Sequence, residues 1–72
     1  MKNLHQTIRN LRHLHSLSIM QMAEKLNMDR KTYELIEKGT TQLTDDRIRK
    51  IAAIFGMTPA ELYTFEDNIE DT

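Results

Sequence analysis

Hydrophobic residues return every three or four positions along most of this 72-residue chain, with polar residues between them. This is the period of amphipathic helices, and no useful length of chain alternates with the period of two that is typical of strands. Five helical segments are predicted, beginning at residues 4, 19, 30, 45 and 59. A chain of this length forms one small domain, so the pattern predicts an all-α fold of five short helices around one core.

The same spacing predicts which side chains face that core. In each segment the apolar positions fall on one side of the helix and the polar positions on the other. Leu17 is expected to be buried just before the second segment, and Leu43 is expected to plug the loop before the fourth. The full inward set is Leu4, Ile8, Leu11, Leu17, Ile19, Met22, Ala23, Leu26, Tyr33, Ile36, Leu43, Ile48, Ile51, Ala52, Ile54 and Phe55.

Start and stop signals separate the segments. Ser18 with Gln21, and Thr58 with Glu61, have the spacing of a capping box, in which each side chain bonds the backbone amide of the other residue. Glycines follow the third and fourth segments, where a helix commonly ends in a left-handed residue. These are Gly39 and Gly56. The residues expected to cap the five helices are Asn3, Ser18, Asp29, Thr44 and Thr58.

The second and third segments are joined by a turn that is too short to let two helices lie antiparallel. Asn27 and Met28 interrupt the apolar pattern between them. A tight crossing of this kind leaves the outer face of the following helix, residues 30–38, free of the core. A DNA major groove accepts such a helix, so the geometry indicates a helix-turn-helix unit over residues 18–39 with 30–38 as its recognition helix.

The residues of this unit resemble the lambda-repressor-like (XRE or Cro-type) helix-turn-helix family. The matching features are Leu17-Ser18, Met22-Ala23, Ile36-Glu37-Lys38-Gly39, Phe55-Gly56 and Thr58-Pro59-Ala60-Glu61-Leu62. The similarity covers residues 4–63, and it is specific because several independent features agree in order and spacing. It implies a compact five-helix DNA-binding domain over residues 1–63. It also implies that Arg12 and Glu37 form a structural ion pair.

Charge is divided unevenly along the chain, although the net charge is only −1. Residues 1–50 contain all ten Lys and Arg against six acids, a net charge of +4, whereas residues 51–72 contain five acids and no Lys or Arg, a net charge of −5. Phosphate contact depends on local cations and counterion release, so the basic part suits double-stranded DNA. Residues 64–72 are predicted to form an acidic C-terminal tail that lowers non-specific affinity for DNA.

The first turn of the recognition helix supplies the best candidates for DNA contact, Arg30, Lys31 and Thr32. In helix-turn-helix proteins these N-terminal residues reach base edges. Glu34 and Leu35 lie on the exposed side of the same helix. Glu34 could accept a hydrogen bond from a cytosine amino group, and Leu35 could pack on a thymine methyl. Equally, Glu34 could repel phosphate or pair along the helix with Lys31 or Lys38.

The resemblance assigns contacts with the DNA backbone to a group of residues in and before the next loop, namely Lys38, Thr40, Thr41 and Gln42. It also reveals a departure at Ile19, where the family usually has a glutamine whose amide binds a phosphate. Ile19 cannot make that contact, which is therefore missing or supplied by Ser18 or by the backbone amides at the helix start. The alternative for Ile19 is a structural role, because it is in phase with the inward residues of its helix.

Other classes of function find little support. The chain has no cysteine, and the spacing of His5, His13 and His15 fits no recurring metal site, so no metal or cofactor is expected. No constellation for acid–base or nucleophilic chemistry is present, which argues against an enzyme. No apolar run reaches the length of a membrane span and the N-terminus lacks a signal-peptide core, so the predicted location is the cytoplasm.

The sequence thus predicts a sequence-specific transcriptional regulator, most simply a repressor that binds a palindromic operator as a homodimer. A protein-interaction module on the same fold is the alternative, and the antitoxin of a toxin–antitoxin pair is a special case of it. Ile19, Glu34, Leu35 and the acidic tail favour this alternative, since such a tail suits a basic protein partner. Dimerisation is implied by the resemblance alone.

Overall fold

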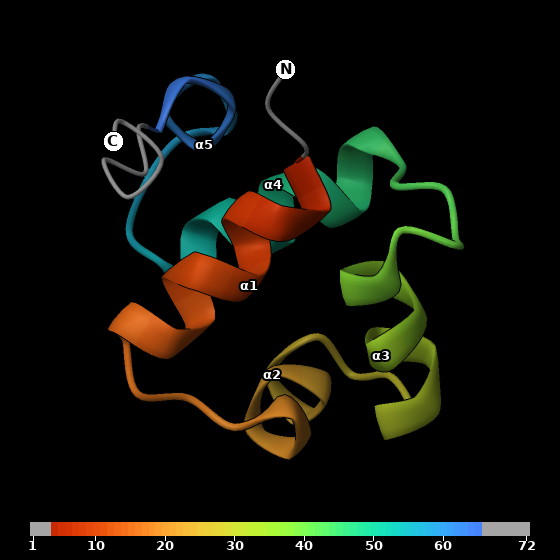
Figure 1. Cartoon of the computed structure of the whole chain (residues 1–72). Helices are drawn as coiled ribbons and strands as arrows, with labels where there is room; N and C mark the ends of the chain where they lie inside the picture. The colour runs from red at the N-terminus through yellow and green to blue at the C-terminus, as the bar shows by residue number, and fades with distance from the viewer. Residues whose placement is uncertain (1–3, 66–72) are drawn as a thin grey trace, which may run out of the picture.

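A computed structural model describes residues 4–65 of the chain, and within this range it contains five α-helices and no strand. The helices are α1 (Leu4–Leu14), α2 (Ile19–Lys25), α3 (Arg30–Lys38), α4 (Asp45–Ile54) and α5 (Pro59–Thr64) (Figure 1). The predicted all-α fold of five helices is confirmed, and each helix begins at the predicted residue. Asn3, predicted to cap α1, lies outside the described residues.

Side-chain caps fix the beginnings of three helices. At α2, the Ser18 hydroxyl accepts from the Gln21 amide at 3.0 Å, and the Gln21 side chain accepts from the Ser18 amide at 2.8 Å. Thr58 and Glu61 form the same capping box at α5, with distances of 3.1 and 2.8 Å. At α4, Thr44 Oγ1 accepts from the amide three residues on at 3.2 Å. Each cap contributes about 1 kcal/mol to stability.

The predicted cap of α3 is wrong in one respect. Asp29 occupies the N-cap position with an extended backbone, φ −67° and ψ 149°, but its side chain makes no capping hydrogen bond. Because Asp29 is exposed, water can satisfy the amides of the first turn, and no burial drives the carboxylate onto them. Its negative charge still lies at the favourable end of the helix dipole.

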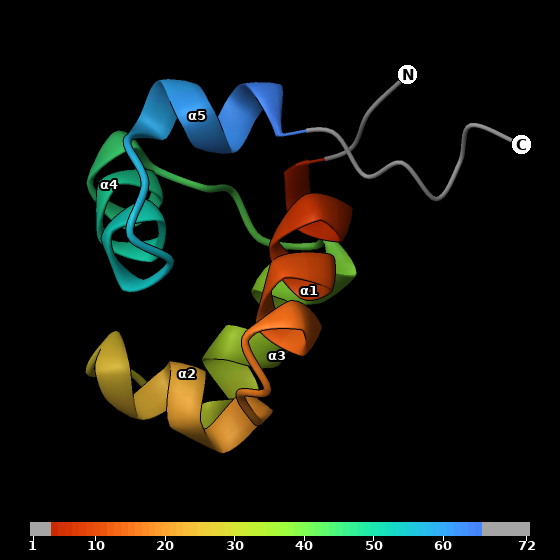
Figure 2. The ribbon, with the colours of Figure 1, turned by 90° about the vertical axis from the view of Figure 1, so that its left-hand side faces the viewer.

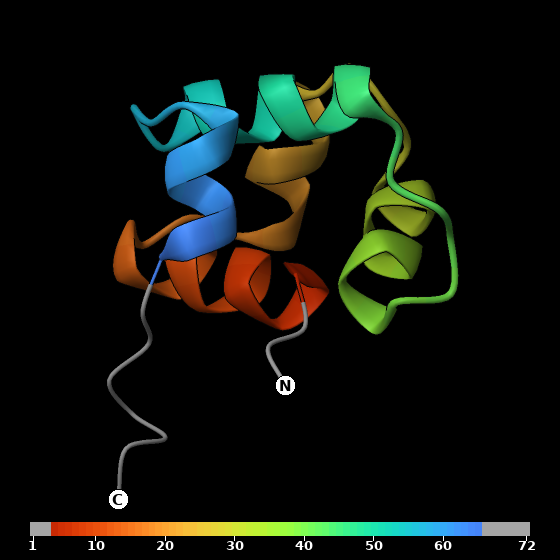
Figure 3. The same ribbon diagram turned by 90° about the horizontal axis from the view of Figure 1, so that it is seen from above.

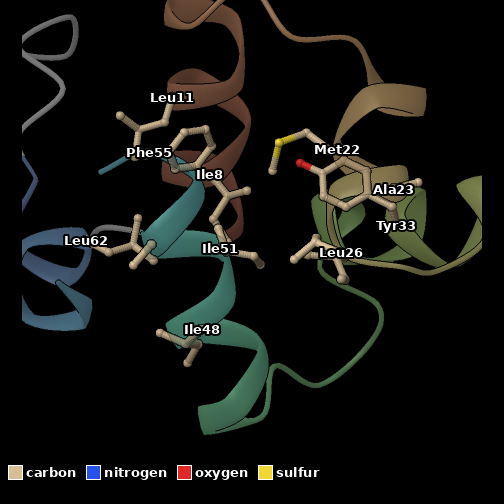
Figure 4. Packing of buried hydrophobic residues seen from close by; sticks show 12 residues of the cluster. Ile8, Leu11, Met22, Ala23, Leu26, Tyr33, Ile48, Ile51, Phe55 and Leu62 are labelled. Atoms are coloured by element: carbon tan, nitrogen blue, oxygen red, sulfur yellow. The ribbon is translucent and has the colours of Figure 1, made fainter. Parts of the chain in front are cut away.

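Twelve apolar side chains are buried, and all five helices contribute to them. They are Ile8, Leu11, Met22, Ala23, Leu26, Tyr33, Ile36, Ile48, Ile51, Ala52, Phe55 and Leu62. Figure 4 shows α4 crossing the middle of this core, with Leu62 of α5 on one side and Met22 and Tyr33 on the other. Fully burying one such side chain is worth roughly 1.5–3 kcal/mol, so this core is the main source of stability.

Five residues predicted to face inward are only half-buried at the rim of the core: Leu4, Leu17, Ile19, Leu43 and Ile54. The expectation that Leu17 is buried is therefore wrong, because the turn before α2 runs along the surface, with Ser16 at φ 56°. Three buried residues, Thr7, Arg12 and Leu62, were not in the predicted inward set. In a domain of this size, many positions lie at the edge of the core and few lie at its centre. The apolar stripe of a helix therefore predicts more fully buried side chains than the structure contains.

The helices form two packed pairs, α2 with α3 and α4 with α5, and α1 packs on α3. In Figure 2, α4 and α5 lie in the upper part of the molecule and α2 in the lower part, while α1 runs beside α3. Seen from above, α3 and α5 lie at opposite ends, with α1 and α4 running across between them (Figure 3). None of the helices within residues 4–65 has the length and hydrophobicity that a bilayer crossing needs.

The C-terminal boundary of the folded part lies later than predicted. Helix α5 continues to Thr64, and Phe65 packs against the core. Helix α5 thus extends one residue past the predicted domain end at residue 63, and Thr64 and Phe65, which were assigned to the tail, belong to the described helix and its packing. The remainder of the predicted tail, residues 66–72, lies outside the described residues.

Candidate nucleic-acid interface

Helices α2 and α3 pack directly against each other and cross steeply, as Figure 1 shows. The turn between them depends on Asn27, which has a left-handed backbone with φ 58°. Its neighbour Met28 closes the turn by donating its amide hydrogen to the carbonyl oxygen of Ala23 at 3.0 Å. This short connection holds α3 at the end of the molecule, with one long side of the helix turned away from the core.

The inner side of α3 is fixed by Tyr33 and Ile36, both of which have no exposed surface. The outer side carries Arg30, Lys31 and Leu35, all of which are exposed. Lys31 and Leu35, four residues apart, lie on the side of the helix opposite to Tyr33 and Ile36, which are three apart. Arg30 is exposed at the first position of the helix. Helix α3 therefore presents charged and apolar side chains outward from a rigidly packed base.

A polar cluster joins α3 to α1 beneath this outer side. Arg12 Nε donates to Glu37 Oε2 at 2.6 Å, and Arg12 Nη2 donates to Glu37 Oε1 at 3.1 Å, which makes the ion pair bidentate. The Tyr33 hydroxyl donates to the same carboxylate. The remaining Arg12 Nη1 donates to the backbone oxygen of Leu17 at 3.0 Å, just before α2. The ion pair implied by the resemblance is thus present, and one arginine links α1, α3 and the turn that leads into α2.

The polar cluster is largely withdrawn from solvent. The two charged side chains, Arg12 and Glu37, are 9% and 8% exposed. The hydrogen bond to Glu37 raises the pKa of the Arg12 guanidinium, although burial acts in the opposite direction. The pKa of the Tyr33 hydroxyl is also raised, mainly by burial and secondly by its hydrogen bond to Glu37. Removing one partner of such a pair leaves the other charge buried and unpaired, at a cost of about 3–5 kcal/mol. The cluster therefore orients α3.

The first turn of α3 presents its cations to solvent. Arg30 and Lys31 are exposed, and Thr32 is half-buried. Arg30 Nε donates to Glu34 Oε2 at 3.2 Å, one helical turn further on. The prediction that Glu34 pairs with Lys31 or Lys38 is therefore wrong, and Arg30 is its partner. Glu34 was also expected to be exposed, but it is half-buried, with 29% of its side chain exposed.

The loop after α3 begins with a left-handed glycine. Gly39 has φ 78°, and its amide and that of Thr40 donate to the carbonyl oxygens of Ile36 and Leu35 at 3.1 Å each. Thr40 Oγ1 also donates to the carbonyl oxygen of Leu35 at 3.3 Å. Of the loop residues predicted to contact DNA, Thr40 and Gln42 are exposed, as is Lys38, and Thr41 is half-buried. Three of these four side chains are therefore exposed and accessible to DNA.

The geometry described so far agrees with the sequence comparison. Residues 8–62, more than half of the chain, match the sequence model of a helix-turn-helix family. The chain belongs to the lambda-repressor-like helix-turn-helix family. Members of this family are DNA-binding regulators, which implies that this helix-turn-helix domain binds DNA. No curated protein gives a match to the chain.

Ser18 and Ile19 stand at the start of α2, where the family contacts a phosphate. In this helix-turn-helix domain Ser18 is exposed, and its oxygen accepts the capping bond from Gln21, which leaves the hydroxyl hydrogen free to be donated. Ile19 is half-buried and packs against the core. Of the two interpretations of Ile19, the structural one therefore has direct support.

An open pocket of about 300 Å³ lies between α1, the start of α2 and the outer edge of α3. It is lined by Arg9, Arg12, Ile19, Glu34, Glu37 and Lys38. Within residues 4–65, Arg9 and Lys38 form no ion pair, whereas the other charged residues of the pocket do. Arg9 was not among the predicted site residues. It is on α1, and only the packing of α1 on α3 brings it beside them, so no local motif could have identified it.

The three histidines lie apart in the helix-turn-helix domain. His15 packs its ring on Phe55, with the ring centroids 5.0 Å apart, and His5 packs over Gly39. Within the part of the chain that the structure describes, no group of three or more histidine, aspartate or glutamate side chains is arranged to hold a metal ion.

Proposed function

We propose that this helix-turn-helix domain is a cytoplasmic, sequence-specific repressor that binds a palindromic operator as a homodimer, with α3 in the major groove. The observation that carries the proposal is the pair of exposed cations at the front of α3, Arg30 and Lys31, on a helix whose inner side is fixed to the core. The N-terminal residues of a recognition helix are the ones that reach base edges.

The outer residues divide into two groups by their place. The first group is proposed to contact bases and lies in the first turn of α3 or on its exposed side. It consists of Arg30, Lys31, Thr32 and Leu35, of which Leu35 offers an apolar surface to a thymine methyl. A second group is proposed to bind the phosphate backbone, which fixes the register of the helix in the groove. This group consists of Ser18, Lys38, Thr40, Thr41 and Gln42.

A dimer follows from the small size of the reading surface. One helix reads only a few base pairs, and a two-fold dimer doubles the contacts over half-sites that lie about 34 Å apart, one turn of DNA. A domain of this size, without a described catalytic site, regulates most simply by covering promoter DNA. These are the reasons for proposing a repressor and a palindromic operator.

The test begins with selection of bound fragments from random DNA, which identifies the operator. The selected operator is then titrated with the wild-type protein and with the double variant Arg30→Ala/Lys31→Ala. We expect the variant to lose most of the specific affinity, because a bidentate arginine–guanine contact alone gives about 1–3 kcal/mol of discrimination. Helical content and the urea midpoint should stay close to wild type, since both side chains are exposed.

The matched control is Arg49→Ala/Lys50→Ala on α4. It removes the same charge from two exposed side chains that are not on α3. This control should retain operator recognition. If both double variants bind the selected operator as well as the wild type does, α3 is not the reader.

A protein-interaction module, such as an antitoxin, is the second candidate. It is favoured by Leu35, whose large apolar side chain is 40% exposed on the same helix. The acidic end of the chain would suit a basic partner. Selection from random DNA that yields no preferred sequence, together with co-purification of one protein in a fixed ratio that Leu35→Ala abolishes, would support this candidate over the repressor.

A further inference from the structure

The geometry points to Glu34 as a positioning residue for base recognition, which holds Arg30 so that the outer edge of its guanidinium reads a guanine. This inference rests on the proposed function, because it requires α3 to lie in the major groove. It replaces one role predicted for Glu34, acceptance from cytosine, and is compatible with the other, repulsion of phosphate.

Only one edge of the Arg30 side chain is engaged. Its Nε donates to Glu34 Oε2 at 3.2 Å, and this is its single hydrogen bond to any residue within 4–65. A guanidinium has five N–H donors in a planar fork, so the four donors on Nη1 and Nη2 stay available. The Arg30 side chain is 61% exposed, which leaves that edge accessible.

Glu34 is held more firmly than the arginine that it pairs with. Its side chain is only 29% exposed, and it lines the pocket that Arg9 and Lys38 also line. Its partial burial leaves the carboxylate fewer positions than the exposed arginine has. The half-buried acid therefore acts as the fixed end of the pair, and the exposed arginine is oriented by it.

The ion pairs on α4 provide a contrast within the same molecule. Asp46 pairs with Lys50 at 3.2 Å and with Arg49 at 3.8 Å, and all three side chains are more than half exposed. Such pairs are ordinary surface contacts with little energetic effect. The pair on α3 differs because its acid is partly withdrawn from solvent and because its arginine stands in the first turn of the recognition helix.

The free edge of Arg30 matches one base. Guanine presents two acceptors, O6 and N7, side by side in the major groove, and a planar arginine edge bonds both at once. A guanidinium whose Nε is already bonded loses less conformational freedom when it binds. Immobilising a flexible side chain on binding lowers affinity by about two- to tenfold. Because Glu34 already holds Arg30, we expect it to increase the preference for guanine by about that factor.

The experiment measures two quantities for each variant. The first is discrimination, the ratio of affinities for the selected operator and for operators in which one guanine is replaced by adenine. The second is affinity for a duplex of unrelated sequence. The variants are Glu34→Ala, which removes the acceptor, and Glu34→Gln, which removes the charge but retains an oxygen that can accept from Arg30 Nε. Asp46→Ala is the control for loss of one surface charge.

We expect the two quantities to move in opposite directions. Glu34→Ala should lower discrimination at one guanine by about two- to tenfold, and Glu34→Gln should recover part of that loss. Both variants should bind unrelated duplex more tightly, because each removes a negative charge that faces phosphate. Asp46→Ala should leave discrimination unchanged. In an Arg30→Lys background, Glu34→Ala should no longer change discrimination, since lysine has no planar edge to orient.

Two results would overturn the inference while the proposed function stands. One is a Glu34→Ala variant that keeps the full preference for guanine. The other is equal discrimination by the alanine and glutamine variants, because charge alone would then explain the effect. Failure of the proposed function looks different, since the wild-type protein would then bind the selected and unrelated duplexes equally well.

Discussion

Tyr33 is the residue at which packing and polar chemistry meet. Its ring is fully buried in the core, while its hydroxyl donates to the carboxylate that also binds Arg12. A buried hydroxyl without a partner would cost about 1–3 kcal/mol, and here the partner is already held by the bidentate arginine. One side chain therefore fills the core beneath α3 and completes the cluster that orients it.

The pKa of Tyr33 leads to a prediction at high pH. Burial raises this pKa above the ordinary value of 10.0. Below pH 10 both the folded and the unfolded chain hold the proton, so the hydroxyl gives no pH dependence. Above pH 10 the unfolded chain releases the proton first, so the free energy of unfolding should fall, by up to about 1.4 kcal/mol per pH unit from this group.

The measurement is urea unfolding at several pH values between 8 and roughly 11, the range that brackets this titration. The variant Tyr33→Phe should be less stable at pH 8, because Glu37 loses a hydrogen bond, but its stability should fall less steeply above pH 10. Lysines also titrate there, but they are common to both proteins. Tyr63→Phe, a change at an exposed tyrosine on α5, is the matched control. Equal slopes for wild type and Tyr33→Phe would contradict the prediction.

Single residues also show where sequence analysis reaches its limit. The inward positions of α3 followed from helical spacing, and the choice of Arg30 and Lys31 followed from their place in its first turn. The partner of Glu34 did not, because three basic residues stand three or four positions away and spacing cannot rank them. Arg9 escaped notice for a different reason, since its neighbours in the pocket come from other helices and only tertiary packing brings them together.

At the scale of the elements, two glycines end helices in the same backbone conformation but in different surroundings. Gly39 has φ 78° and Gly56 has φ 72°. A methyl group added at Gly39 would lie 2.8 Å from Cε1 of the His5 ring, whereas one added at Gly56 would meet nothing within 4 Å. Any other residue is strained at such a φ, but only Gly39 has an added steric conflict.

We therefore expect Gly39→Ala to destabilise the domain more than Gly56→Ala. Gly56→Ala should cost about 1–2 kcal/mol, the ordinary penalty of a left-handed conformation. In a His5→Ala background the cost of Gly39→Ala should fall to about that of Gly56→Ala, since the conflict with the ring is gone. Thermal or urea unfolding of the five proteins measures these costs. A cost of Gly39→Ala that does not depend on residue 5 would show that the ring moves aside freely.

The helix starts were the most predictable elements, because capping is local. The boxes at Ser18 and Thr58 need only a residue type and a spacing of three, and both formed. Asp29 had the right type as well, yet its side chain makes no cap. The difference is that a capping box holds both residues by reciprocal bonds, whereas a single exposed carboxylate competes with water.

At the scale of the whole molecule, the uneven charge of the chain gives a further prediction. Residues 66–72 contain four acids, and removing them changes the net charge from −1 to +3. The shortened protein should bind unrelated DNA more tightly at low salt. This gain should fade near physiological ionic strength, where charges more than about 8 Å apart are screened. Preference among operators should not change, because no proposed base contact is removed.

A full-length variant in which the four acids are replaced by their amides is the matched control, since it removes the charge without shortening the chain. Anisotropy titrations at several salt concentrations measure both proteins. If the shortened protein gains affinity and the amide variant does not, chain length and not charge is responsible. Affinity that is unchanged in both proteins at low salt would show that these acids do not influence DNA binding.

The cluster of Arg12, Tyr33 and Glu37 has a consequence for how such a regulator can acquire new targets. All of its bonds point into the domain, whereas Arg30, Lys31 and Leu35 point out of it. The residues that fix α3 to the domain and the residues proposed to contact bases are thus different residues of one nine-residue helix. A duplicate of the gene could be directed to a different promoter by a few codon changes on the outer side, without any compensating change within the protein.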